Sequence, residues 1–151
     1  MSDTPKLLSV DDSAIIRKIV KNTADLLGFG LLEAGNGQEA LDILKNHASE
    51  VNLILLDWNM PVMDGPTTLK FLKESADTAN IPVMMLTTEG AKSNIIEAIK
   101  GGAKQYFLTK PFTPEDLSTR ILQCVDVDDF LTHDSPAYRP ALSHSLNFNL
   151  C

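Results

Sequence analysis

The chain has few cysteines, no long apolar run and little positive charge. Its 151 residues include two cysteines, Cys124 and Cys151, too few for a disulfide framework and suited to a reducing compartment. No apolar stretch approaches the ~20 residues that cross a bilayer, and the first residues, MSDTPK, have no signal-peptide core. These absences predict a cytoplasmic protein without a membrane anchor.

Lysine and arginine number 13 against 20 aspartates and glutamates, which gives a net charge of -7. Binding to nucleic acid or to anionic lipid needs a basic face, so neither is an expected partner. The three histidines have no metal-ligand spacing. What remains is an ordinary globular composition, 44% hydrophobic and 22% charged, at a length that fits one domain.

Short apolar runs alternate five times with amphipathic segments of helical period. The expected strands are residues 6–10, 31–34, 51–56, 81–86 and 105–109, and the expected helices are residues 15–27, 38–47, 67–74, 94–100 and 114–125. This order predicts an α/β fold, a doubly wound parallel sheet of five strands with five helices on its two faces.

The third strand is the most apolar and ends on a carboxylate. The segment is residues 51–65, VNLILLDWNMPVMDG. Its apolar start predicts a strand buried on both faces that ends at Asp57. Pro61 and Asp64-Gly65 then predict that the chain leaves the sheet. Open α/β sheets build their sites at the carboxyl ends of strands, so Asp57 is a candidate site residue. Taken by itself, Asp57 would be better explained as a solvated residue at a strand end or as the start of an Asx turn.

Polar residues also follow the other strands. Asp11 and Asp12 come after the first strand, Thr87 after the fourth and Lys110 after the fifth, and parallel strands bring all of these to one edge. A pair of carboxylates 4 Å apart costs ~4 kcal/mol at an effective dielectric of 20. Three acids and one lysine leave two negative charges, which a divalent cation would neutralise, and oxygen ligands favour Mg²⁺ over Zn²⁺.

Such a neutralised site can admit a phosphoryl group. Lys110 and the Thr87 hydroxyl could then hold phosphoryl oxygens while Asp57 acts as the nucleophile. Simpler roles remain open for each residue: Asp12 or Ser13 as a helix cap, Thr87 and Thr88 bonded to their own backbone, and Lys110 as a surface lysine. The arrival of all of them at one edge favours the functional interpretation.

These motifs resemble those of two-component receiver domains, and most of all the stand-alone chemotaxis regulators of the CheY-like type. The resemblance covers residues 6–125, within a predicted receiver domain of residues 1–125, and it implies a flavodoxin-like sheet with strand order 2-1-3-4-5. It also implies a signalling switch and not an enzyme. The run DWNMP from Asp57, Glu89 and the run KSNII from Lys92 point to the chemotaxis type.

The resemblance assigns a role to each site residue. Asp57 would accept a phosphoryl group from a phosphohistidine of a sensor histidine kinase, and Mg²⁺ would be bound by the acids and by the backbone carbonyl of Asn59. Among the acids, Asp12 would bind directly and Asp11 partly through water. Thr87 and Lys110 would bind the phosphoryl group, while Asn59, Thr88 and Glu89 would influence the lifetime of the acyl phosphate.

A switch aromatic and a partner surface are implied as well. The spacing from Gly102 to Lys110 is one residue longer than in the family. Counting forward from Gly102 makes Tyr106 the switch aromatic, and counting back from Lys110 makes it Phe107. An insertion in a loop costs less than one in a strand, which favours Phe107. The surface near Lys92 and Phe107 would bind a target such as the flagellar motor switch, and a phosphatase is a further expected partner.

Other functions fit the residues less well. A phosphorelay intermediate that returns its phosphoryl group to a second histidine is the main alternative. An aspartate-nucleophile phosphatase would need a second aspartate where Asn59 stands, and a flavin mononucleotide carrier would place phosphate where Asp11 and Asp12 repel it.

Residues 126–151 lie outside the resemblance. Four aspartates and two prolines predict a solvated linker, and the apolar residues then alternate as in a strand. These apolar residues are Leu142, Leu146, Phe148 and Leu150. The tail is therefore expected to be disordered, or to add a strand to its own sheet or to that of a second copy, which leaves monomer and tail-mediated dimer both open.

Overall fold

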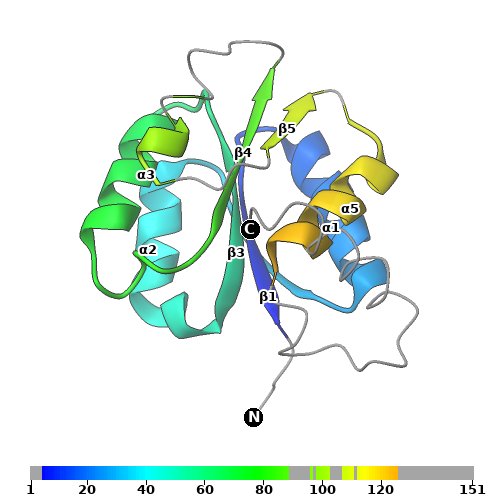
Figure 1. Ribbon diagram of the computed structural model, residues 1–151, viewed down its shortest axis with the longest axis horizontal. Coiled ribbons are helices and arrows are strands. Elements are labelled where there is room, and N and C mark those ends of the chain that lie inside the picture. The colour runs from blue at the N-terminus through cyan, green and yellow to red at the C-terminus, as the bar shows by residue number, and fades with distance from the viewer. Residues whose placement is uncertain (1–4, 89–95, 97, 103–106, 111, 126–151) are drawn as a thin grey trace.

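The computed structural model describes residues 5–88, 96, 98–102, 107–110 and 112–125. Five parallel strands form one sheet in the order β2-β1-β3-β4-β5, as predicted (Figure 1). The strands are β1 (Lys6–Val10), β2 (Gly30–Ala34), β3 (Val51–Asp57), β4 (Val83–Thr88) and β5 (Phe107–Lys110). All five carboxyl ends therefore lie at the same edge of the sheet.

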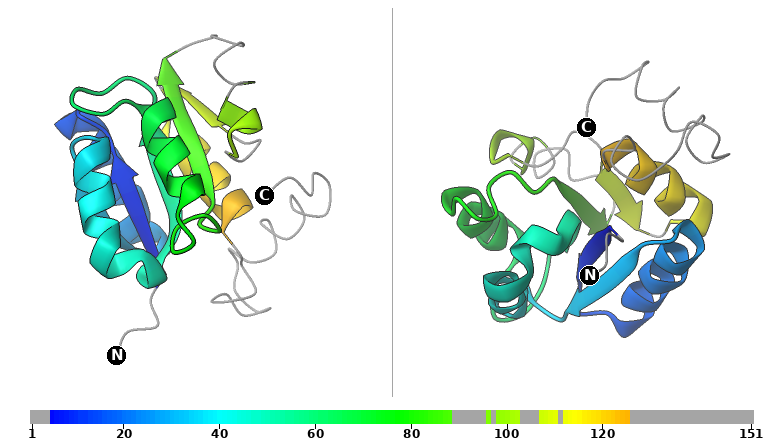
Figure 2. Two further views of the ribbon diagram at one scale, coloured as in Figure 1. Left: turned by 90° about the vertical axis from the view of Figure 1, so that its left-hand side faces the viewer. Right: turned by 90° about the horizontal axis from the view of Figure 1, so that it is seen from below.

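Helices cover both faces of the sheet. They are α1 (Ala14–Leu27), α2 (Gly37–His47), α3 (Gly65–Glu74) and α5 (Pro114–Cys124), with a short 3-10 helix, η1 (Ala48–Glu50). Residues 96 and 98–100 are also helical, where the sequence predicts the fourth helix. Helices α1 and α5 pack on one face and α2 and α3 on the other, as the end-on view in Figure 2 shows.

The core is divided by the sheet into two clusters. Leu8, Ile54 and Leu56 point toward α2 and α3, while Leu53 and Leu55 point toward α1 and α5. Every residue of β3 except Asn52 is buried, which explains its unbroken apolar sequence. Because β3 is the central strand and is covered on both faces, it places Asp57 in the middle of the sheet edge.

Strand β4 and helix α3 each begin two residues away from the predicted start. Strand β4 begins at Val83, two residues late, because Pro82 has no N–H to donate to the ladder. Helix α3 begins at Gly65, two residues early, because the Asp64 side chain accepts a hydrogen bond from the Thr67 N–H and caps it there.

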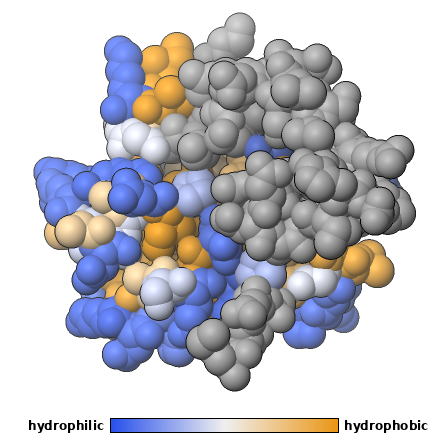
Figure 3. All heavy atoms as spheres, turned by 60° about the horizontal axis from the view of Figure 1, so that its bottom comes forward, coloured by the Kyte–Doolittle hydropathy of each residue, from blue (hydrophilic) through white to orange (hydrophobic). Residues whose placement is uncertain are grey.

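The described surface is mostly hydrophilic at the end where the strands begin, as Figure 3 shows. Of the described helices, none is both long and apolar enough to cross a bilayer. Residues 126–151 lie outside the described part of the chain, so the division into a domain of residues 1–125 and a tail stays a prediction.

Candidate functional site

Three carboxylates meet at the carboxyl edge of the sheet. Asp11 and Asp12 follow β1, Asp57 ends β3, and one oxygen from each lies within 4.8 Å of the others. Asp11 is fully buried and Asp57 is 6% exposed, whereas Asp12 is exposed. The predicted convergence of the three acids is therefore confirmed.

Lys110, the last residue of β5, reaches across the same edge. Its Nζ lies 2.7 Å from Oδ2 of Asp11 and 3.1 Å from Oδ1 of Asp57. The Lys110 side chain is only 13% exposed, so it is not an ordinary surface lysine. It is the counter-ion of the two buried acids.

The buried charges shift the pKa values of Asp57 and Lys110. Burial raises the pKa of Asp57, the charge of Asp11 raises it further, and the hydrogen bond from Lys110 partly opposes both. Burial alone would lower the pKa of Lys110, but the hydrogen bonds and charges of Asp11 and Asp57 outweigh it and raise that pKa. An ionised Asp57 is thus held in a site that disfavours its charge.

The turn after β1 orients the acidic pair. The Ser13 N–H donates to Oδ1 of Asp11 (2.9 Å), and Oγ of Ser13 accepts a hydrogen bond from the Ile16 N–H (3.3 Å). Ser13, and not Asp12, is therefore the N-cap of α1. The carboxylate of Asp12 stays at the exposed rim of the cluster.

Arg17 braces this turn from α1. Its Nη1 donates to the backbone carbonyl of Asp11 (2.6 Å), and its Nε donates to the Glu33 carboxylate (3.3 Å) at the end of β2. The guanidinium therefore joins the β1–α1 turn to the neighbouring strand. Sequence reasoning missed Arg17, because nothing in a helical arginine shows that it contacts a backbone carbonyl in another turn.

The loop after Asp57 is closed by backbone contacts. The Trp58 N–H donates to the Leu86 carbonyl (3.1 Å), and the Gly65 N–H donates to the Trp58 carbonyl (2.8 Å). A Cβ on Gly65 would lie 2.4 Å from the Asp57 carbonyl oxygen, so only glycine fits there. Within the loop Asn59 is exposed, and Val62 has a positive φ of 69°, a strained conformation for a β-branched residue.

The remaining site residues are described in part. Thr87 is buried near the end of β4, one residue beyond Leu86, which pairs with Asp57 in the sheet register. Lys110 pairs with Thr88. The backbone of Phe107 begins β5, whereas Glu89, Lys92 and Tyr106 lie outside the described residues, so the assignment of the switch aromatic stays a prediction.

The donor set suits a hard divalent cation. Three carboxylates offer only oxygen ligands, and neither histidine nor cysteine belongs to the cluster that the described residues form. Oxygen ligands of this kind favour Mg²⁺, and the exposed position of Asp12 leaves room for water on the metal. The residues present therefore fit the predicted Mg²⁺ site.

A family model described as the response regulator receiver domain matches residues 7–122. The chemotaxis protein CheY1 of Helicobacter pylori is 40% identical over 125 residues, which cover 82% of this chain and 99% of that protein.

Solved structures are similar as well. The chemotaxis response regulator CheY4 of Vibrio cholerae has a TM-score of 0.75 at 34% identity, with 81% of this chain and 99% of that chain covered. The CheX–CheY–BeF3–Mg²⁺ complex of Borrelia burgdorferi has a TM-score of 0.72 at 29% identity, with 78% and 87% covered. With its sheet order, acidic cluster and most of its length matched in this way, the chain belongs to the response regulator receiver domain family, whose members are signalling switches and not enzymes.

Proposed function

We propose that this chain is a single-domain response regulator that accepts a phosphoryl group on Asp57 from a phosphohistidine of a sensor histidine kinase. The observation that carries the proposal is the nearly buried Asp57 carboxylate, held between Asp11, Asp12 and the ammonium of Lys110. In the transfer, a carboxylate oxygen of Asp57 bonds to phosphorus as the bond from phosphorus to the histidine nitrogen breaks. The departing imidazole takes up a proton, and an acyl phosphate remains.

The other residues position and neutralise charge. Lys110 already contacts Asp57 and can follow the oxygens of the arriving group, and the buried Thr87 hydroxyl is a second donor from β4. Asp11, Asp12, Asp57 and the backbone carbonyl of Asn59 would hold Mg²⁺. When bound, Mg²⁺ offsets the surplus negative charge that would otherwise repel a phosphoryl donor.

The output is proposed to be a change of affinity for a protein target. Phosphorylation would draw in Thr87, let Phe107 or Tyr106 turn inward, and alter the surface of the fourth helix, β5 and α5 near Lys92. The relatives named as chemotaxis proteins support a role in chemotaxis. With that role we propose a target such as the flagellar motor switch and a cytoplasmic location. The B. burgdorferi CheY in complex with CheX and Mg²⁺ supports both the metal and a further protein partner, such as a phosphatase.

A phosphorylation assay tests the assignment of Asp57. The protein is incubated with Mg²⁺ and a small phosphodonor such as acetyl phosphate, and its intact mass is measured. We expect a mass gain of one phosphoryl group in the wild type and none in Asp57→Asn, with Asp25→Asn, an exposed acid of α1, as the matched control. Equal labelling of wild type and Asp57→Asn would refute the proposal.

A transfer assay separates the chemotaxis switch from the phosphorelay intermediate. The phosphorylated protein is mixed with histidine phosphotransfer proteins, and radiolabel is followed on both partners. Loss of label to water, with none on the histidine protein, supports the switch. Passage of the label to a histidine supports the relay.

A further inference from the structure

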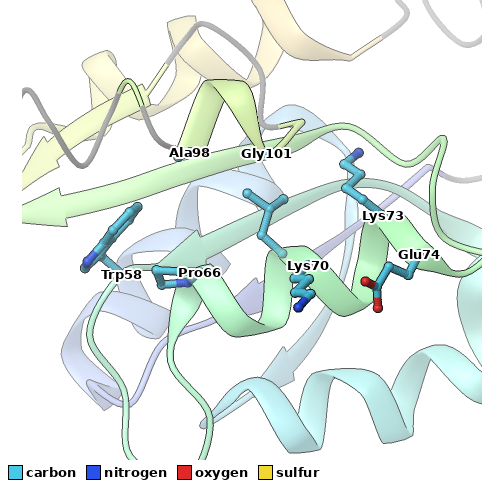
Figure 4. Close-up of a pocket in the computed structure, with 8 residues that line it drawn as sticks. Trp58, Pro66, Lys70, Lys73, Glu74, Ala98 and Gly101 are labelled. Carbon is cyan, nitrogen blue, oxygen red and sulfur yellow. The ribbon is translucent and has the colours of Figure 1, made fainter.

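A groove lies between α3 and the helical residues 98–100, beside the proposed phosphoacceptor. It has a volume of about 300 Å³, with Trp58, Pro66, Leu69 and Ala98 as its apolar lining. Figure 4 shows Trp58 and Pro66 at one end of the groove and Lys73 and Glu74 at the other. This volume is at the small end of binding clefts, which suits one or two apolar side chains of a peptide.

Backbone hydrogen bonds hold the groove residue Trp58 next to the site. Both backbone groups of Trp58 are hydrogen-bonded, its N–H to Leu86 and its carbonyl to Gly65, and Trp58 directly follows Asp57. The indole is half-buried against the core cluster under α2 and α3. A side chain that enters the groove would therefore contact the neighbour of Asp57.

The charges at the groove differ in sign from those of the whole chain. Among the described residues, Lys70 and Lys73 line it with one acid, Glu74, whereas the chain carries a net charge of -7. Lys73 is fixed there, because its Nζ donates to the carbonyls of Ala79 (3.0 Å) and Ile81 (3.2 Å). An acidic segment with apolar side chains would match both the lining and the rim.

Residues 126–151 of the chain carry both kinds of side chain, with the acids nearer α5 and the alternating apolar residues nearer the C-terminus. H. pylori CheY1 is matched over 99% of its length by 82% of this chain, and the receiver domain model matches residues 7–122, so most of residues 126–151 lie outside the part that the two proteins share. The segment begins with Asp126, Asp128, Asp129 and Asp134 and ends with the alternating apolar residues Leu142, Leu146, Phe148 and Leu150.

We propose that residues 126–151 dock in this groove of their own domain, with apolar side chains from residues 142–150 beside Trp58 and Leu69. The tail leaves α5 at Val125, and residues 126–141 extended at ~3.3 Å each span about 50 Å. A domain of this size has a radius of gyration of about 14 Å, so that the apolar residues can reach the groove. The tether gives the tail a local concentration in the millimolar range, which lets a weak contact be occupied most of the time.

The test uses Trp58, the only tryptophan of the chain, in the full-length protein without phosphodonor or Mg²⁺. In the double variant Leu146→Asp/Phe148→Asp the tail should no longer dock in the groove. The control Ser145→Asp/Asn147→Asp adds the same charge at neighbouring positions, and its tail should still dock. We expect a red-shifted emission and about a twofold larger acrylamide quenching constant in the first variant only. Lys70→Glu, on the exposed rim, should shift the emission in the same direction.

Two outcomes would overturn the proposal. Identical emission and quenching in wild type and in Leu146→Asp/Phe148→Asp would show that the tail does not cover Trp58. Quenching that depends on protein concentration, together with a dimer mass in sedimentation, would show that the groove binds the tail of a second copy. The fluorescence measurement needs no phosphorylation. A negative result would therefore leave the assignment of Asp57 as phosphoacceptor intact, and loss of that assignment would leave the docking of the tail intact.

Discussion

The ammonium nitrogen of Lys110 lies 3.1 Å from Oδ1 of Asp57, although β4 separates their strands, β5 and β3, in the sheet. The proposed acceptor is therefore paired with a cation before a metal or a phosphoryl group arrives. The same lysine also contacts Asp11, so that it competes with Mg²⁺ for two of the three acids. Stability and metal affinity are consequently coupled through these few side chains.

Asp57→Asn should stabilise the domain at neutral pH. The pKa of Asp57 in the folded state is raised above its usual 3.8, so the folded wild type loses stability as the pH rises from about 3.8 through the raised value. The Asp57→Asn variant loses no stability in this way, because an asparagine side chain does not ionise. We expect a gain of about 1 kcal/mol at pH 7, or roughly 4 °C in Tm, that vanishes below pH 3.8.

Thermal melts of wild type and Asp57→Asn between acid and neutral pH measure this difference, with Asp25→Asn as the control. A gain that was independent of pH would contradict the electrostatic explanation. A variant less stable than wild type at pH 7 would mean that the contact with Lys110 outweighs the burial of the charge.

Lys110→Met should bind Mg²⁺ more tightly than the wild type, although the protein without metal should be less stable. Removal of the ammonium leaves Asp11 and Asp57 without their counter-ion, which costs about 1–3 kcal/mol, and it also removes the cation that repels Mg²⁺. We expect about a tenfold gain in affinity when Mg²⁺ is titrated against Trp58 fluorescence. Lys45→Met, on the exposed end of α2, should leave the affinity unchanged.

Gly65→Ala should disrupt the site through the backbone. The new Cβ would lie 2.4 Å from the Asp57 carbonyl oxygen and 2.9 Å from Cα of Trp58, and neither atom can move without the strand. We expect a loss of about 2–3 kcal/mol in urea unfolding and weaker Mg²⁺ binding. Gly35→Ala, whose Cβ would meet only the ends of the flexible Glu39 and Arg17 side chains, at 3.4 Å and 3.8 Å, is the matched control and should change little.

The sequence predicted the fold and the main site residues for physical reasons that the structure makes plain. The apolar run of β3 is unbroken because both faces are covered, and parallel strands must bring Asp11, Asp57 and Lys110 to one edge. The contacts of Gly65 and Arg17 were not predictable, because they join backbone atoms of separate turns. A pattern of residue types contains no such distances.

Arg17→Ala should weaken Mg²⁺ binding, which tests whether Arg17 positions the acidic pair. Its contact with the Asp11 carbonyl (2.6 Å) fixes the peptide between Asp11 and Asp12, and loss of this support should cost about tenfold in affinity. Loss of a positive charge alone would strengthen Mg²⁺ binding, so the direction of the change separates positioning from electrostatics. Arg17→Lys should recover part of the affinity, because its ammonium can reach one of the two acceptors.

Titration of Mg²⁺ against Trp58 fluorescence measures this effect, and Lys21→Ala, an exposed lysine one turn further along α1, is the control. Melts in saturating Mg²⁺ show whether each variant still folds. If Arg17→Ala binds Mg²⁺ as tightly as the wild type or more tightly, the guanidinium contributes only charge, and the contacts of Asp11 with Ser13 and Lys110 are enough to hold the acidic pair.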